Sequence, residues 1–406
     1  MMKSKFFETH LRPIIFGFFL LLSLIKMRHF IFEGRLWAEE GRDFYSNIAG
    51  MGWPSGLFFV FNGHLEWVTN GVVFLSTLVP FEISPLVTTY SSLLIQSVPI
   101  LLLAFYRDRL KLTSWQTYLW VLIAAGVPQA PEVWANSINL HFHFTLLVGL
   151  LALFPIDSHF PKWGARLALF LAGISGIPPN FFAPIFGLIA LKSRNKERWI
   201  QFIILCLTSL IQCAVLFRNH FESGDRQLFS TPATLWLAPL SQVFLSPLLG
   251  FRVASWVTGS LRTACDGDLR GYGLGLFLSS GPFWLIYFAI KKKNSTAITA
   301  IFSALYIAVL STLLSLGDKK GLISTDGGGR YYYASILLLW IGVFSILNDL
   351  PKLVRHGLVA LIALVSISNF PRTSSGPAWR QSLALARLQS SSTVPIWPQG
   401  WEMPLK

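Results

Sequence analysis

Runs of about 20 mostly apolar residues recur along this chain, separated by short polar connections. A helix of that length crosses the hydrocarbon core of a bilayer. Only 13% of the residues are charged, against about 25% in soluble domains, so a surface facing water could not be covered. Charge is costly in lipid, so a lipid-facing surface explains its scarcity. The sequence therefore predicts an all-α, polytopic transmembrane helical bundle.

We expect about 11–12 spans, since each needs about 20 apolar residues. The best candidates carry few or no charges, and they are 12–32, 84–105, 113–128, 139–155, 198–217, 272–290, 296–316, 332–350 and 353–369. Shorter apolar runs lie at 66–80, 164–177 and 179–192. The last two flank Pro178 and Pro179, which must interrupt a helix and predict a short helical hairpin.

The segment 234–260 is apolar but contains Pro239, Pro247, Gly250 and Arg252. Its composition leaves open whether it is interfacial or re-entrant. The three cysteines have no paired spacing, so neither a disulfide framework nor a zinc site is expected. The net charge of +14 is the sum of short basic connections, and no soluble basic segment predicts a nucleic-acid partner.

Lys and Arg concentrate before residue 13 and at 107–111, 192–198 and 291–293. By the positive-inside rule these segments are cytoplasmic. The extracytoplasmic regions would then be 33–65, 129–138, 218–271 and 317–331, and the integral domain 1–369 would be followed by an extracytoplasmic tail, 370–406. One conflict remains. If 66–80 and 84–105 both cross, 107–111 falls outside, so either 66–80 does not cross fully or that loop breaks the rule.

Acidic residues concentrate in the first predicted outer loop and its end, at Glu33, Glu39, Glu40, Asp43 and Glu66. A solvated loop would explain these charges. The interleaved aromatic residues instead favour a segment at the membrane surface, whose carboxylates face a protein cavity. A partly desolvated carboxylate near a cation can act as a general base.

A second polar cluster follows the spacing i, i+4, i+7, i+11 at Glu132, Asn136, Asn139 and His143. On a continuous helix this spacing puts all four side chains on one face, and His141 points elsewhere. The two histidines, two residues apart, cannot share a helical face to chelate a metal, and no metal site is predicted. A polar helix cap and a ligand-binding surface both remain open.

A third cluster, Asp326-Gly327-Gly328-Gly329-Arg330-Tyr331, opens the predicted span 332–350. Glycines allow close backbone approach, and a helix N-terminus offers free N–H groups to an anion. Arg330 can clamp a phosphate bidentately. A simple interfacial anchor of Arg330 and the tyrosines is the alternative. No Lys-Ser/Thr follows the glycines, which excludes a nucleotide P-loop.

Several of these stretches resemble motifs of bacterial membrane glycosyltransferases with the GT-C fold. Ala38-Glu39-Glu40-Gly41 is similar to the family's Ala-Glu-Asp-Gly, with Glu40 in place of Asp. Gly63-His64-Leu65 resembles Gly-Tyr-Leu, with His64 in place of Tyr. Asn136, Asn139 and His141 resemble Asn-x-x-Asn-x-His-Trp, with Phe142 in place of Trp.

Later elements extend the resemblance. Ser175-Gly176-Ile177-Pro178 resembles a Ser-Gly-Pro turn, and Gly329-Arg330-Tyr331 and Pro398-Gln399-Gly400-Trp401 resemble the family's late Arg-Tyr and Pro-x-Gly-Trp elements. The likeness covers roughly 30–190 and 320–406. Residues 195–315 match no motif of the family.

The resemblance implies an inverting transferase in the bacterial cytoplasmic membrane. It would move a sugar from a polyprenyl-phosphate-linked donor to a glycan or lipid acceptor on the outer face, in cell-envelope polysaccharide or glycolipid assembly. Glu40 or Glu39 would be the base and Arg330 the phosphate clamp. The implied substrate-binding residues are Asp43, His64, Glu132, Asn136, Asn139, His141, Arg330 and Tyr331. Metal dependence varies within the family, and the sequence identifies no cofactor.

Other functions remain open. A transporter or flippase of lipid-linked glycans would need functional charges inside its spans and inverted halves. An O-antigen-type polymerase or ligase would favour a large outer loop with arginines, such as Arg218, Arg226, Arg252, Arg262 and Arg270. A scaffold without catalysis is the third alternative.

Overall fold

The computed structural model describes residues 2–127, 130–156, 161–219, 230–315, 319–325, 327–368 and 377–405; Arg226 and Asp326 lie outside these ranges. It is 78% helical with very few strands, which confirms the all-α class. Within the described residues, six helical runs are long and apolar enough to cross a membrane: Ser84–Leu110, Lys196–Arg218, Pro232–Asp266, Leu269–Lys291, Ser295–Leu314 and Gly329–Leu347. The length and composition of these helices are those of a multi-pass membrane protein. The larger count of spans stays a prediction.

Every predicted long apolar run is helical, close to its expected bounds. The helices are α1 (Met2–Glu33), α4 (Ser84–Tyr106), α5 (Ser114–Gly126), α7 (Leu140–Leu153), α10 (Lys196–Arg218), α13 (Leu269–Lys291), α14 (Ser295–Leu314), α15 (Tyr333–Leu347) and α16 (Lys352–Ser368). The shorter runs form α3 (Trp67–Thr77), α8 (Lys162–Gly173) and α9 (Ala183–Ser193). A 3-10 turn, η4 (Pro178–Phe182), separates α8 from α9, as the two prolines predicted.

The core is built around α15, which packs against α14 and α7. Of the most apolar 18 residues in the run Gly329–Leu347, which includes α15, 83% are buried. The corresponding shares in α10 and α13 are 22% and 17%. Gly342 lets α15 approach α14 closely, because a Cβ there would lie 2.6 Å from Ile301 Cγ1. Trp120 of α5 ties that helix to α15 by donating to the Leu337 carbonyl at 2.9 Å. The exposed apolar faces of α10 and α13 are the surfaces expected to meet lipid.

The basic connections lie at one end of the bundle. Gln116 at the start of α5 donates to Asn348 after α15 at 3.2 Å. Asn294, which caps α14, donates to Ser345 near the end of α15 at 3.1 Å. Arg198 at the start of α10 donates to carbonyls at the end of α7. The segments 107–111, 192–198 and 291–293 therefore share an end, as the charge pattern predicted.

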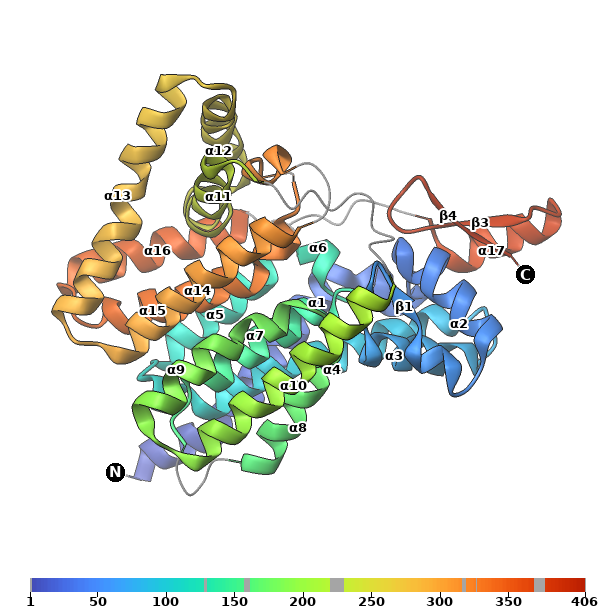
Figure 1. Cartoon of the computed structure of the whole chain (residues 1–406), viewed down its shortest axis with the longest axis horizontal. Coiled ribbons are helices and arrows are strands. Elements are labelled where there is room, and N and C mark those ends of the chain that lie inside the picture. Colours follow the sequence, from blue (N-terminus) through green and yellow to red (C-terminus); the bar gives the residue numbers. More distant parts are fainter. Residues whose placement is uncertain are drawn as a thin grey trace.

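The conflict over 66–80 is resolved by the position of α4. Tyr90, near the start of α4, donates to Ile31 near the end of α1 at 2.6 Å, so α4 begins where α1 ends. α3 has 11 residues, which span about 16 Å and cannot traverse the bundle. It stays at the end where the tail and α2 (Ser46–Met51) gather, while the N-terminus lies at the other end (Figure 1). The Arg107–Lys111 loop therefore lies at the same end of the bundle as the other basic connections.

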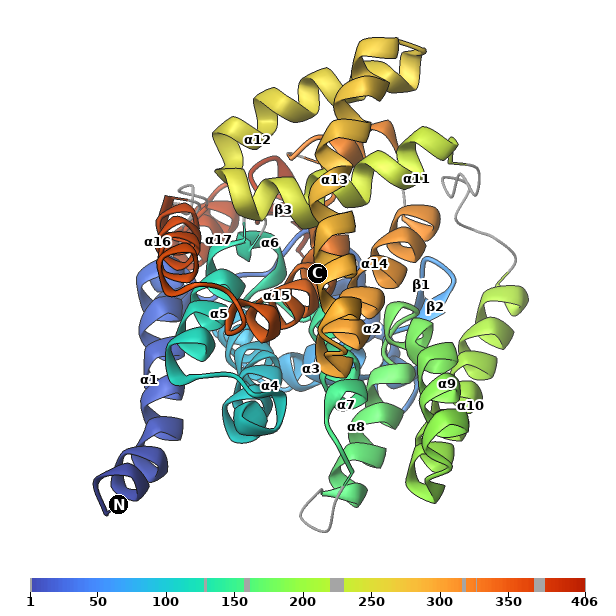
Figure 2. The same ribbon diagram turned by 90° about the vertical axis from the view of Figure 1, so that its left-hand side faces the viewer.

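The segment left open, 234–260, forms a bent helical run. It consists of α11 (Pro232–Pro239), the π-helix η5 (Leu240–Leu245), α12 (Ser246–Arg262) and the 3-10 turn η6 (Thr263–Asp266), with a kink at Gly250 where φ is 77°. Thr234 Oγ1 lies 3.5 Å from Cys265 Sγ, so the two ends of the run meet. Figure 2 shows α11 and α12 at the end of the molecule far from the N-terminus. A run that returns to its starting level favours the re-entrant interpretation.

The tail packs against the loop that follows α1. The Trp397 N–H donates to the Leu36 carbonyl at 3.1 Å, and the Arg42 guanidinium lies 4.3 Å from the centre of the Trp401 ring. The described part of the tail comprises α17 (Trp379–Leu388), β3 (Thr393–Ile396) and β4 (Trp401–Pro404). The strands pair antiparallel.

Candidate functional site

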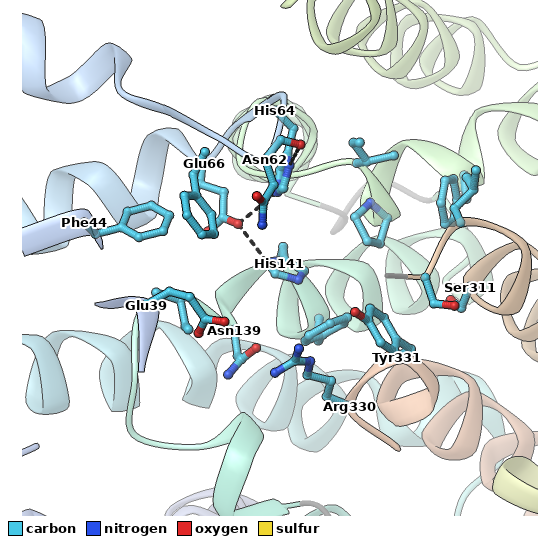
Figure 3. A pocket seen from close by; sticks show the side chains of 18 residues that line it. Glu39, Phe44, Asn62, His64, Glu66, Asn139, His141, Ser311, Arg330 and Tyr331 are labelled. Atoms are coloured by element: carbon cyan, nitrogen blue, oxygen red, sulfur yellow. Dashed lines mark hydrogen bonds and ion pairs between the residues drawn. The ribbon is translucent and has the colours of Figure 1, made fainter. Parts of the chain in front are cut away.

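A cavity of about 120 Å³, partly open to solvent, lies at the end of the bundle opposite the basic connections. Figure 3 shows the side chains that line it. The first outer loop, the starts of α7 and α15, the η4 turn and the end of α14 all contribute to it. Its polar lining consists of Glu39, Asn62, His64, Glu66, Asn139, His141, Ser311, Ser315, Arg330 and Tyr331.

The two acids of the first loop point in different directions. Ala38 has a left-handed φ of 40°, and a π-helix, η1 (Glu40–Tyr45), follows. Glu39 lines the cavity, and its Oε2 is buried without a hydrogen-bond partner among the described residues. π-turns and left-handed residues are rare and recur at functional sites, where they re-aim side chains.

Glu40 is fully buried and lies outside the cavity lining. Its Oε1 accepts hydrogen bonds from Ser137 N at 2.7 Å and Ser137 Oγ at 2.5 Å, and its Oε2 accepts one from Trp37 N at 3.0 Å. Burial raises the pKa of Glu40, although these hydrogen bonds and nearby Arg35 act in the other direction. Glu40 therefore ties the first loop to the segment before α7, and Glu39 is the acid that faces the cavity.

Arg330 lies in the 3-10 turn η8 (Gly329–Tyr332), directly before α15. It forms an ion pair with Glu132, which stands beside the cavity rather than in its lining. Its guanidinium lies 5.4 Å from the centre of the Tyr331 ring. Glu39 also acts electrostatically on Arg330. Arg330 is thus paired with one carboxylate, is influenced by the charge of a second, and lines the cavity.

The glycines before Arg330 pack against their own chain. A Cβ on Gly327 would lie 2.1 Å from the Gly321 carbonyl oxygen, in the turn η7 (Lys320–Ile323). Gly328 has a φ of 57°. Gln242 of η5 donates to the Gly327 carbonyl at 3.1 Å and to two carbonyls just before it. The predicted close approach is thus to the turn at 320–323, and anion binding by these amides stays a prediction.

Glu66 lies between two histidines of the cavity wall. Its Oε1 is 3.0 Å from His64 Nε2 and 3.5 Å from His141 Nδ1. Burial alone would raise the pKa of Glu66, but the charges and hydrogen bonds of His141 and His64 outweigh burial and lower it to about 2. Glu66 was predicted as one of the clustered acids but not as a site residue. Its position next to the Gly63-His64-Leu65 element was the available signal.

The prediction of one helical face from Glu132 to His143 is wrong. α6 (Ala130–Val133) ends before α7 begins at Leu140, and Ala135 between them has a left-handed φ of 59°. The Asn136 and Asn139 side chains both donate to the Glu132 carbonyl at 2.7 Å. Such bonds compete with helix continuation.

The break changes which histidine faces the cavity. His141 lines the cavity, although the helical spacing predicted that it points elsewhere; the family resemblance had placed it among the substrate-binding residues. His143 is 1% exposed, with Nε2 3.2 Å from the Val133 carbonyl oxygen. Asn139 lines the cavity, and the fully buried Asn136 accepts from its amide at 2.9 Å.

The structure brings six of the predicted site residues to the cavity wall: Glu39, His64, Asn139, His141, Arg330 and Tyr331. Glu132 lies at its edge through the Arg330 ion pair. Outside it lie Glu40, Asn136 and Asp43, the last paired with Arg42 at 2.9 Å. The described tail residues do not line it. The roles assigned to these residues stay predictions.

Within the described ranges, no group of three or more His, Cys, Asp and Glu side chains is arranged to hold a metal ion. No family model, curated protein or solved structure matches the chain. Fold and cavity together define a class: a multi-pass helical membrane protein with a cavity at one end of its bundle, whose wall carries both apolar and charged side chains.

Proposed function

We propose that this protein is a membrane glycosyltransferase of the GT-C type. It transfers a sugar from a polyprenyl-phosphate-linked donor to a glycan or lipid acceptor at the outer face of the bacterial cytoplasmic membrane. One observation carries the proposal: an acid of the first outer loop, Glu39, and a late arginine, Arg330, line the same cavity although they are far apart in sequence. The order of the motifs matches the resemblance, and the cavity joins them.

The reaction requires a base for the acceptor hydroxyl group and a cation for the leaving phosphate, on opposite sides of the anomeric carbon. Glu39 accepts the proton of the acceptor hydroxyl group as the acceptor oxygen bonds to the anomeric carbon of the sugar. The bond from that carbon to the donor phosphate breaks, and its electron pair leaves with the lipid phosphate. Arg330 stabilises the negative charge on the departing phosphate. Attack opposite the leaving group inverts the anomeric centre.

Glu39 is preferred to Glu40 as the base because of its free oxygen. Glu40 already accepts three hydrogen bonds, from Ser137 and Trp37. Glu39 Oε2 is buried without a hydrogen-bond partner among the described residues. A buried carboxylate oxygen without a partner is unfavourable unless a ligand supplies the missing donor. An acceptor hydroxyl group is such a donor.

The rival functions gain less from the arrangement. A transporter needs charges inside its spans that are available to cargo, but Arg198 donates to the carbonyls at the end of α7. Lys26 of α1 donates to the Ala125 carbonyl. A polymerase or ligase would use the arginines of 218–271, and none of those in the described residues lines the cavity.

The test is transfer from a radiolabelled undecaprenyl-phosphate hexose, with glucose, galactose and mannose compared, in membranes containing the full chain. Glu39→Gln should lower transfer about 100-fold or more, as expected for loss of a general base. Glu82→Gln is the matched control, because Glu82 pairs with Arg387 on the surface at 2.6 Å.

Glu40→Gln completes the set. It should lower the amount of folded protein rather than the rate per folded molecule, because its hydrogen bonds hold the loop. Full transfer activity in Glu39→Gln would exclude Glu39 as the base. Absence of transfer from all three donors, with folded wild-type protein, would refute the hexosyltransferase proposal.

A further inference from the structure

The turn that precedes Arg330 is joined to the bent helical run of α11, η5, α12 and η6 by the side chain of Gln242. This side chain is 1% exposed. Its nitrogen donates to the carbonyls of Leu322 at 3.0 Å, Ser324 at 2.5 Å and Gly327 at 3.1 Å. Gln242 does not line the cavity, and it lies in the part of the chain that matches no motif of the family. The base and the phosphate clamp proposed above give it no role.

The three carbonyls fix the orientation of the Gln242 amide. A carbonyl oxygen only accepts hydrogen bonds, so the group that faces all three must be the NH2, which has two hydrogens to donate. A carbonyl that loses its donor away from water is unfavourable. Without the amide, the three peptide groups would therefore move apart to find other donors. Gln242 holds together a turn whose carbonyls converge on it.

The backbone of η5 (Leu240–Leu245) directs Gln242 toward this turn. Prolines stand on both sides of it, at positions 239 and 247, and Pro247 has no N–H to donate to the helix. The Ser246 N–H bonds to the Ser241 carbonyl, five residues back, which is the spacing of a π-helix. Single π-turns are rare and occur frequently at functional sites.

The position of the turn determines the position of Arg330. Gly327, three residues before Arg330, is in close contact with η7, because a Cβ on it would lie 2.1 Å from the Gly321 carbonyl oxygen. Gly328 then has a left-handed φ of 57°, and η8 begins at the next residue. Figure 3 shows the Arg330 side chain on the cavity wall. Its guanidinium pairs with Glu132, so the turn holds the backbone and that carboxylate holds the side chain.

Building on the proposed function, we propose that Gln242 is a positioning residue for Arg330. By holding the carbonyls of Leu322, Ser324 and Gly327 together, it fixes the turn from which the guanidinium reaches the phosphate of the lipid-linked donor. Loss of this hold leaves Arg330 in the chain but no longer aimed, so the negative charge on the departing phosphate is stabilised less. The bent helical run then contributes to the site from behind, although none of residues 232–266 lines the cavity.

Modification of arginine by phenylglyoxal reports the position of Arg330 without transfer activity. The full chain is treated in detergent, and peptide mass spectrometry compares Arg330 with Arg166. Both pair with a glutamate, and their side chains are 27% and 21% exposed. Gln242→Met keeps the length of the side chain but has no hydrogen to donate. It should raise the ratio of Arg330 to Arg166 modification about three-fold or more, because the turn opens locally.

Gln116→Met is the matched control. Gln116 is also fully buried and donates to the Phe344 carbonyl at 2.9 Å, near the far end of α15, so this variant should keep the wild-type ratio. An unchanged ratio in Gln242→Met would overturn the proposal, and so would an equal rise in Gln116→Met. If Gln242→Met does not fold, Gln242→Glu gives the same test, because a protonated carboxyl group has a similar shape but only one hydrogen to donate.

Transfer kinetics test whether the effect reaches the reaction through Arg330. Gln242→Met should lower kcat about ten-fold per folded molecule. Added to Arg330→Gln, the same substitution should lower kcat no further, because the cation that Gln242 positions is already absent. An unchanged kcat in Gln242→Met, or an equal loss in both backgrounds, would refute the positioning role. If the wild type transfers no sugar, the proposed function fails, whereas the modification ratio still decides whether Gln242 positions Arg330.

Discussion

The part of the chain that resembles the family's motifs and the part that does not differ in how much of the cavity wall they supply. Residues 30–190 and 320–406 supply most of the cavity wall and the most buried candidate span, whose hydrophobic window is 83% buried. Residues 195–315 contain α10 and α13, with windows 22% and 17% buried, and only the end of α14 from this region reaches the cavity. The difference separates a site-forming part from a part in which α10 and α13 present apolar surface, while its runs Pro232–Asp266 and Ser295–Leu314 are 72% and 50% buried.

The largest expected effect is on chemical labelling of the loops in both regions. A loop on the outer side of the membrane should be labelled fully in intact cells, and a loop on the inner side should not be labelled at all. In a variant without Cys206, Cys213 and Cys265, a membrane-impermeant maleimide should label Asp268→Cys in intact cells. It should label Asp108→Cys and Lys292→Cys only after permeabilisation, since these sites lie in or beside the basic connections. Labelling of Asp108→Cys in intact cells would contradict the non-crossing α3.

Paired arginine substitutions compare the chemistry of the two regions. Arg330→Gln should lower transfer about 100-fold or more, because it removes a cation aimed at the departing phosphate. Arg270→Gln, at the start of α13 and outside the cavity lining, should leave transfer unchanged. Equal losses in both variants would abolish the functional distinction between the regions.

Paired glycine substitutions compare the packing of the two regions. Gly342→Ala places a methyl group against Ile301, and such overpacking costs about 1–3 kcal/mol. Gly273→Ala in α13 meets nothing within 4 Å and should be neutral or stabilising, since alanine favours a helix. Thermal unfolding in detergent should show a midpoint lowered by several degrees for the first variant only. A comparable loss for Gly273→Ala would show that this face of α13 packs against a partner.

The smallest expected effect is on the stability of the fold against unfolding at acidic pH. The pKa of Glu66 falls from 4.5 to about 2 on folding, so its contribution is present above pH 4.5 and disappears as the pH falls toward 2. Glu66→Gln removes that contribution. The difference in unfolding midpoint between wild type and variant should therefore shrink between pH 4.5 and pH 2. A difference that stays constant over this range would contradict the ion pairs with the histidines.

Hydropathy predicted the helices well, because a lipid-facing helix must be apolar over its whole length. The bounds of α4, α10 and α14 lie within a few residues of the predicted runs. Hydropathy could not decide whether 66–80 or 232–266 crosses. Those outcomes depend on which helix ends meet, and such contacts between distant residues leave no periodic signal.

The sequence predicted which residues line the cavity more accurately than it predicted where their side chains point. Glu39 and Glu40 are equivalent in composition, but the left-handed Ala38 and the following π-helix separate them. Ala135 breaks a helix that the spacing of Glu132 and His143 favoured, and alanine is a strong helix former that gives no warning of this.

The contact between the tail and the first loop has a consequence for biogenesis. Trp397 pairs with the backbone of Leu36 and Ala38, immediately before Glu39. Trp397 is synthesised long after the loop that follows α1. Until then, the backbone of Leu36 and Ala38 lacks this hydrogen-bond partner. This contact can therefore form only after residue 397 has been synthesised. A nascent chain that stalls before the tail would hold its helices without a finished site.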